Sequence, residues 1–316
     1  MPVSGNKTRY LNFCQTYPVP LHGQPWWLDA VCGPDEWDVC LTENAAGEII
    51  GSWPYSLQRR MGLPIIRPAP LTSYGGPWLQ YPANPDLKAP SRYDFEQKMY
   101  AGLLEQLPPT VFFQQNLYPE VINGLPFHWA GYQLHTRYTY RFNTWSEQLP
   151  EPMDSGTRNK IRQAERTFEV VMTEDFAAFR AIYQAATARR KWKPVDEHLL
   201  ERLERAAQAQ QARYIFIARH RTSGQDQAAL YITRDQRRAY CLLSGFRADA
   251  PLDQTIYLLY AAVLHFCARQ GLTFDFEGSL DAGVGHVFRK MGAVLTPYLQ
   301  LRKSSKLIQL AQTIMR

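Results

Sequence analysis

The stretch FDFEGSLDAGVGHVFRKMGAVLTPYLQLR, residues 274–302, decides the fold that the sequence predicts. Phe274 and Phe276 alternate with Asp275 and Glu277, as in a strand with one apolar and one polar face. Asp281 is a candidate N-cap for a short helix, and a turn with Gly292 follows that helix. A final strand closes the stretch. The order predicted here is therefore strand, helix, strand.

The same order occurs earlier in the chain. FHWAGYQLHTRYTYR at 127–141 and FRKMGAVLTPYLQLR at 288–302 share Phe, Gly, Leu and Arg at one offset, since 288 − 127 = 161. Phe113 with Phe274, and Leu103 with Leu264, keep this offset. The shared identities and order favour an internal duplication.

Both halves begin with a polar hairpin, at 37–55 with a turn at Asn44–Gly47, and at 213–233 with a turn at Ser223–Gly224. A strand at 239–246 follows the second hairpin. Each half then has an amphipathic helix, a strand, a short helix and a final strand. The paired ranges are 92–107 and 253–270 for the helix, 111–115 and 272–277 for the strand, and 131–142 and 293–302 for the final strand. Residues 155–166, 175–190 and 195–210 read as helices between the halves, with a short strand at 168–172.

We therefore expect an α/β (α+β) protein with two tandem units, 1–145 and 146–316. Each unit should contain a mixed, mostly antiparallel sheet flanked by helices. Gly131 and Gly292 should lie at helix-to-strand turns, and Leu134 and Leu295 should be buried alike. A length of 316 residues suits two domains better than one.

The composition is that of a globular protein, with 45% hydrophobic and 20% charged residues. A formal charge of +6 favours phosphate-bearing partners, although a solvated surface with a slight Lys/Arg surplus explains it equally well. The N-terminus lacks a signal-like apolar run, and the longest apolar stretch, 256–267, is shorter than the ~20 residues that span a bilayer. The 5 cysteines have no zinc-like spacing. We expect a cytoplasmic protein with reduced thiols, no membrane span, no metal and no disulfide.

Several short motifs point to one superfamily. RNKIRQA at 158–164 matches R-x-x-I-R-x-A, PLTSYGGPWL at 70–79 matches P-x-x-x-Y-x-G-x-W, and FRKMG at 288–292 matches F-(R/K)-x-(F/M)-G. With the FDFEGS strand end and the element order, the chain resembles the GNAT acyltransferases. Its duplication resembles the Fem-type aminoacyl transferases and their bacterial acetyltransferase-like relatives. The resemblance implies two tandem GNAT-like units, a degenerate and supporting one at 1–145 and an acyltransferase unit at 146–316.

The resemblance also implies a cleft between strands 239–246 and 272–277, with Ser244, Asp275, Glu277 and Ser279 at its edge. We assign catalytic roles to Asp275 and Glu277, which could position and deprotonate an amine, and to Tyr298, which could protonate the leaving group. The alternatives are carboxylates that pair with arginine or cap a helix, and a half-buried core tyrosine. The counterpart of this cleft near Gln114 should be narrower or filled by aromatic side chains.

The sequence leaves two classes of donor open, acyl-CoA and aminoacyl-tRNA. A CoA-binding GNAT has a glycine-rich loop before its main helix, whereas residues 244–253 here contain one glycine and two aspartates, with Arg247 as the compensating charge. Trp192, within a region rich in Arg and Lys, could stack on a base of a nucleic acid, although a solvated helix face is the simpler explanation. The donor-binding candidates are Ser244, Gly245, Arg247, Ser279, Phe288, Arg289, Lys290 and Trp192.

The expected function is therefore transfer of an acetyl or aminoacyl group from acyl-CoA or aminoacyl-tRNA to an amine of a small molecule or peptide. One alternative is an aminoacyl-tRNA-dependent transferase that modifies a peptidoglycan precursor. Another is a non-catalytic, degenerate double-GNAT binding module, which the atypical loop at 244–253 favours. The sequence does not indicate an oligomeric state.

Overall fold

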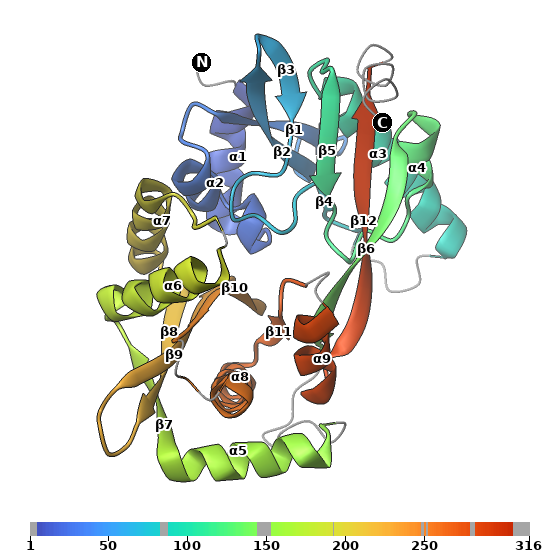
Figure 1. Ribbon diagram of the computed structural model, residues 1–316. Coiled ribbons are helices and arrows are strands. Elements are labelled where there is room, and N and C mark those ends of the chain that lie inside the picture. Colours follow the sequence, from blue (N-terminus) through green and yellow to red (C-terminus); the bar gives the residue numbers. More distant parts are fainter. Residues whose placement is uncertain are drawn as a thin grey trace, which may run out of the picture. The chain divides into compact units, whose positions relative to one another are not determined.

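The computed structural model describes residues 5–82, 88–143, 153–191, 193–247, 250, 252–278 and 282–305. The chain forms two compact units, Met1–Arg137 with Pro297–Arg316, and Tyr138–Thr296. It passes from one unit to the other inside strands β6 (Gln133–Phe142) and β12 (Val294–Ser304) (Figure 1). These bounds differ from the expected boundary at 145, because each half gives its last strand to the sheet of the other.

The sheet of the first unit has the strand order β1-β2-β3-β5-β12, with β4 paired to β2. β3 and β5 are parallel, and the other pairs are antiparallel. Figure 1 shows the red β12 beside β5. The elements are α1 (Gly5–Thr16), the 3-10 helix η1 (Leu21–Gly23), α2 (Pro25–Val31), β1 (Trp37–Glu43), β2 (Ile49–Arg60), β3 (Leu63–Ile66), β4 (Trp78–Leu79), α3 (Ala89–Gln106), β5 (Phe112–Asn116) and α4 (Leu125–Trp129).

The sheet of the second unit has the order β7-β8-β9-β10-β11-β6. Here β10 and β11 are parallel, and the other pairs are antiparallel. The elements are α5 (Ser155–Thr167), β7 (Phe168–Thr173), α6 (Phe176–Arg190), α7 (Glu197–Ala209), β8 (Arg213–His220), β9 (Asp226–Arg234), β10 (Arg238–Phe246), α8 (Leu252–Gln270), β11 (Thr273–Asp275) and α9 (Ala282–Lys290).

The two halves share strand order and strand direction, so the duplication is confirmed. β1, β2, β3 and β5 correspond to β8, β9, β10 and β11, with one parallel pair at the same place in each sheet. Gly131 and Gly292 both adopt left-handed backbone, with φ of +83° and +84°. The turns have matching hydrogen bonds, from the Tyr132 N–H to the Phe127 carbonyl and from the Ala293 N–H to the Phe288 carbonyl.

One expectation about the repeat is wrong. Leu134 and Leu295 are equivalent but exposed, with 36% and 51% of their surface accessible. They lie near the beginnings of β6 and β12, ahead of the residues that pair with β11 and β5. Alternation along a strand identifies its two faces, but it does not say whether another element covers them.

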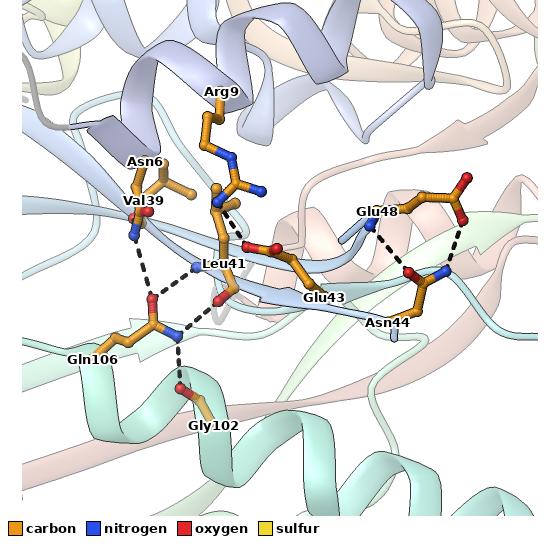
Figure 2. Close-up of polar contacts among 9 residues, drawn as sticks. All are labelled: Asn6, Arg9, Val39, Leu41, Glu43, Asn44, Glu48, Gly102 and Gln106. Carbon is orange, nitrogen blue, oxygen red and sulfur yellow. Dashed lines mark hydrogen bonds and ion pairs between the residues drawn. The ribbon is translucent and has the colours of Figure 1, made fainter. Parts of the chain in front are cut away.

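Local polar contacts explain the first hairpin. Figure 2 shows the Asn44 side chain accepting a hydrogen bond from the Glu48 N–H, which closes the expected turn at Asn44–Gly47. It also shows Gln106, at the end of α3, bonding both backbone groups of Leu41 and accepting from Asn6 of α1. Gln106 therefore joins α1, β1 and α3.

The core of the second unit lies on both faces of its sheet. Ile215 and Ile217 of β8 pack with Phe179 of α6 and Leu200 of α7, while Phe216 packs with the cluster that contains α5 and α8. Because successive side chains point to opposite faces and all three are buried, β8 is covered on both faces. No helix in the described part of the chain has the length and apolarity needed to cross a bilayer.

Candidate functional site

The two central strands of the second unit separate soon after they meet. β10 and β11 pair only from Arg238 with Thr273 to Tyr240 with Asp275, whereas β10 continues to Phe246. A β-bulge lies at this point, because Cys241 pairs with Ile232 and Leu243 with Tyr231, which leaves Leu242 outside the register. A bulge re-aims backbone groups out of the ladder. Among the described residues, no strand pairs with 241–246 on the β11 side.

Asp275 lies at this separation, and its side chain is fully buried. Its carboxylate accepts hydrogen bonds from Thr139 Oγ1 at 2.6 Å and Arg141 Nε at 2.5 Å, both on β6, and from the Glu277 N–H at 2.8 Å. These contacts anchor β11 to β6. Proton abstraction by Asp275 would require this ion pair to open, so its catalytic role stays a prediction.

Glu277 lies at a sharp turn after β11. Glu277 and Gly278 have φ of +59° and +72°, and a Cβ on Gly278 would lie 2.6 Å from the Tyr138 carbonyl oxygen. Only glycine fits that close approach. Burial raises the pKa of the Cys241 thiol to about 12, a hydrogen bond with Tyr260 opposes the rise, and the charges of Glu277 and Asp275 add to it. The charge of Glu277 therefore contributes to the raised pKa of the Cys241 thiol, at the edge of the bulge.

The candidates on α9 have distinct positions. Phe288 is buried, and its ring centroid lies 4.2 Å from that of Phe276. Arg289 is exposed, and its Nη1 donates to the Tyr140 hydroxyl at 3.2 Å. Lys290 forms an ion pair of 3.0 Å with Asp154, the N-cap of α5. Phe288 thus fixes α9 to the core, and Arg289 is the exposed cation of the two.

The described residues of the stretch 244–253 are Ser244 to Arg247, Ala250, Leu252 and Asp253, and the first three of them belong to β10. A Cβ on Gly245 would lie 2.8 Å from the backbone N and Cα of Tyr183, so the single glycine of 244–253 lets α6 approach β10. The Arg247 carbonyl accepts from Arg189 Nη1 at 3.1 Å, and its N–H donates to the Gln227 carbonyl. Ser244 is half-buried in β10 and pairs with Leu230. The glycine therefore serves helix packing rather than a phosphate loop.

Three sequence-predicted candidates remain. Tyr298 belongs to the first unit, where its ring meets that of Tyr74 edge-on at 5.2 Å. Ser279 and Trp192 lie outside the described residues. Sequence reasoning assigned no role at the site to Thr139 or Arg141, although Arg141 is one of the identities that the repeat shares with Arg302.

The matching strand end in the first unit is closed by a loop. Gln114 replaces Asp275 and is the register partner of Arg302. Gln115 accepts from Trp53 Nε1 at 2.7 Å, and Asn116 bonds Ser73 through its amide and Gly75 through its carbonyl. Tyr74, 1% exposed, lies in this loop. A pocket of about 390 Å³, including space open to solvent, remains beside Gln115 and Asn116.

The comparisons with known proteins agree with this architecture. Residues 155–285 match the family model described as an acetyltransferase (GNAT) domain. FemX aligns with 100% of this chain and 99% of its own, with a TM-score of 0.68 and 12% identity. The chain has a Fem-like GNAT fold. L-PGS from Bacillus licheniformis shares this fold over 98% of this chain and 97% of its own, with a TM-score of 0.57 and 12% identity.

A third structure shares the Fem-like GNAT fold. It is the C-terminal domain assigned to a lysylphosphatidylglycerol synthetase of Agrobacterium fabrum, with 13% identity, a TM-score of 0.54, and 90% and 89% of the two chains aligned. A comparison with curated protein sequences finds no match. Within the described residues, His, Cys, Asp and Glu side chains form no group of three or more that could hold a metal ion.

Proposed function

We propose that this protein transfers an acyl group from an activated donor to an amine, with the reaction at the separation of β10 and β11. The observation that carries the proposal is the bulge at 241–243, located where the parallel pairing ends. A backbone N–H released from the ladder there can donate to the carbonyl oxygen of the acyl group as negative charge develops on it.

Glu277 is the group that we propose takes the proton of the attacking amine. The new bond joins the amine nitrogen to the acyl carbon, and the bond from that carbon to the donor oxygen or sulfur breaks. Asp275 acts as a positioning residue in this scheme, because it bonds the Glu277 N–H and fixes the left-handed turn. The proton that Glu277 takes from the amine then passes to the departing oxygen or sulfur, which balances the step.

An aminoacyl donor is favoured over acetyl-CoA. Gly245 is used for packing against α6, so the loop at 244–253 lacks the glycines that let backbone N–H groups approach a pyrophosphate. The likeness to FemX and to a domain assigned to a lysylphosphatidylglycerol synthetase supports an aminoacyl group. We expect CoA to bind no more tightly than about tens of micromolar by calorimetry. Tight, stoichiometric binding of CoA would overturn this choice of donor.

Single-turnover transfer from a labelled pool of aminoacyl-tRNA to hydroxylamine, a small generic amine, tests the proposal. The wild type should transfer faster than the uncatalysed background, and Glu277→Gln should slow transfer by about 10²-fold. Glu169→Gln is the matched control, because Glu169 lies in the same unit and pairs with Arg221 across the surface. If the wild type transfers from neither aminoacyl-tRNA nor acetyl-CoA, the binding-module alternative replaces the proposal.

A further inference from the structure

The hairpin between β2 and β3 has an unfavourable residue at its turn. Arg60 and Leu63 are register partners, so Met61 and Gly62 form a two-residue turn. Both are left-handed, with φ of +52° and +77°. Such a turn favours Asn–Gly, because Asn tolerates left-handed backbone better than most other side chains do. The left-handed backbone at Met61 is therefore unfavourable for a methionine.

The Met61 side chain contributes nothing to the core. It is 96% exposed, and Leu63 beside it is 49% exposed. The tip projects beyond its neighbours, since β1 pairs with β2 only as far as Ser56 and β5 pairs with β3 only from Ile65. Two apolar side chains are thus held in water at the end of a hydrogen-bonded hairpin.

The charges around this tip are cationic. Arg59 and Arg60 are exposed on the same hairpin, and Arg59 Nη1 donates to the Gly62 carbonyl at 3.2 Å. Arg67 follows β3, and the sequence contains no Asp or Glu between Glu48 and Asp86. Apolar side chains flanked by arginine match the boundary between headgroups and acyl chains in an anionic bilayer.

We infer that the β2–β3 tip docks on an anionic lipid surface, with Met61 and Leu63 in the headgroup boundary and Arg59 and Arg60 on lipid phosphates. A single-stranded nucleic acid fits the tip less well, because aromatic stacking surfaces are missing from residues 59–63. Few side chains take part, so the attachment is reversible. This inference goes beyond the proposed function and does not depend on it.

Vesicle flotation with the full chain tests the inference. The probes are vesicles of phosphatidylcholine alone and of equimolar phosphatidylcholine and phosphatidylglycerol. The wild type should float with the anionic vesicles and far less with the neutral ones. Met61→Asn should lower binding by about 5-fold or more, and its melting temperature should stay equal or rise, because Asn suits the turn. A loss of binding together with a gain in stability is an outcome that simple misfolding does not produce.

Met172→Asn is the matched control, because Met172 is a 57% exposed methionine on β7, in the other unit. It should bind vesicles as the wild type does. The double variant Arg59→Gln, Arg60→Gln should bind anionic vesicles more weakly, and its binding should depend less on salt. The inference is overturned if the wild type does not bind anionic vesicles, if Met61→Asn binds normally, or if Met172→Asn loses binding equally.

Discussion

Arg141 on β6 is the register partner of Asp275 on β11, and its Nε donates a hydrogen bond to the Asp275 carboxylate over 2.5 Å. Both side chains are almost completely buried. Asp275→Asn should lower the free energy of unfolding by about 3 kcal/mol or more, because it leaves the Arg141 charge without its buried counter-ion. Urea denaturation measures this loss. Unchanged stability with transfer reduced by about 10²-fold would instead support Asp275 as the general base.

The repeat supplies a control for this substitution. Gln114 and Arg302 are the equivalent register partners in the first unit, where the strand end carries no acid. Gln114→Asn removes no charge there and should cost less than about 1 kcal/mol. Replacing both Asp275 and Arg141 with apolar residues should cost less than the sum of the single changes.

Gly245→Ala should destabilise the second unit. The new Cβ would lie 2.8 Å from the Tyr183 backbone, which can yield only if α6 moves away from β10. We expect a loss of about 1–3 kcal/mol by urea denaturation, as for other overpacked cores. Gly5→Ala, with nothing within 4 Å, is the neutral control. A variant of normal stability that binds donor poorly would show that Gly245 belongs to a phosphate loop after all.

Gly131→Ala and Gly292→Ala should have similar costs. Both glycines are left-handed, with φ of +83° and +84°, and alanine loses about 1–2 kcal/mol in that region. Asparagine should cost less at either position. The free energy of unfolding of each single variant and of the double variant measures both effects. A large difference between the two positions would mean that the turns are held differently despite their matching hydrogen bonds.

The thiols should be unreactive in the native protein. Burial raises the pKa values of Cys14, Cys40, Cys241 and Cys267 from 9.0 to about 12, and that of Cys32 to about 11. At pH 8 a thiol reagent such as DTNB should label all five cysteines in urea and almost none without it. The pKa of each thiol is higher in the folded protein than in the unfolded chain. This difference favours the folded state at pH values below 9, and its contribution disappears as the pH rises from 9 towards 12. Rapid labelling of the native protein at pH 8 would contradict this assignment.

Local signals in the sequence predicted most of the elements. The Asn44–Gly47 turn is fixed by its own side chain, and the helices at 155–166 and 175–190 begin beside the N-caps Asp154 and Asp175. The sequence repeat, read from the 161-residue offset, predicted the common strand order. These features depend on neighbours in the chain, so one sequence is enough to find them.

The site depended on contacts that local patterns do not contain. Arg141 and Asp275 are separated by 134 positions, and the sequence around either residue does not indicate that the other is its partner. Their register follows from β6 crossing into the other half. The repeat held an unused clue, because Arg141 and Arg302 are identical while Asp275 and Gln114 are not. The arginine is the same in both repeats, but its register partner is Asp275 in the second unit and Gln114 in the first, so the two strand ends differ in charge.

The exchange of β6 and β12 has a consequence for how the chain was assembled and how it can be divided. Each half lacks the closing strand of its own sheet and receives that strand from its counterpart, as subunits do in a domain-swapped dimer. A single repeat of this kind would fill the edge of its sheet only by pairing with a second copy, and joining the two copies in one chain makes that pairing independent of concentration. Cutting the chain at its midpoint would free no autonomous module, only two fragments with open sheet edges that must recombine to fold.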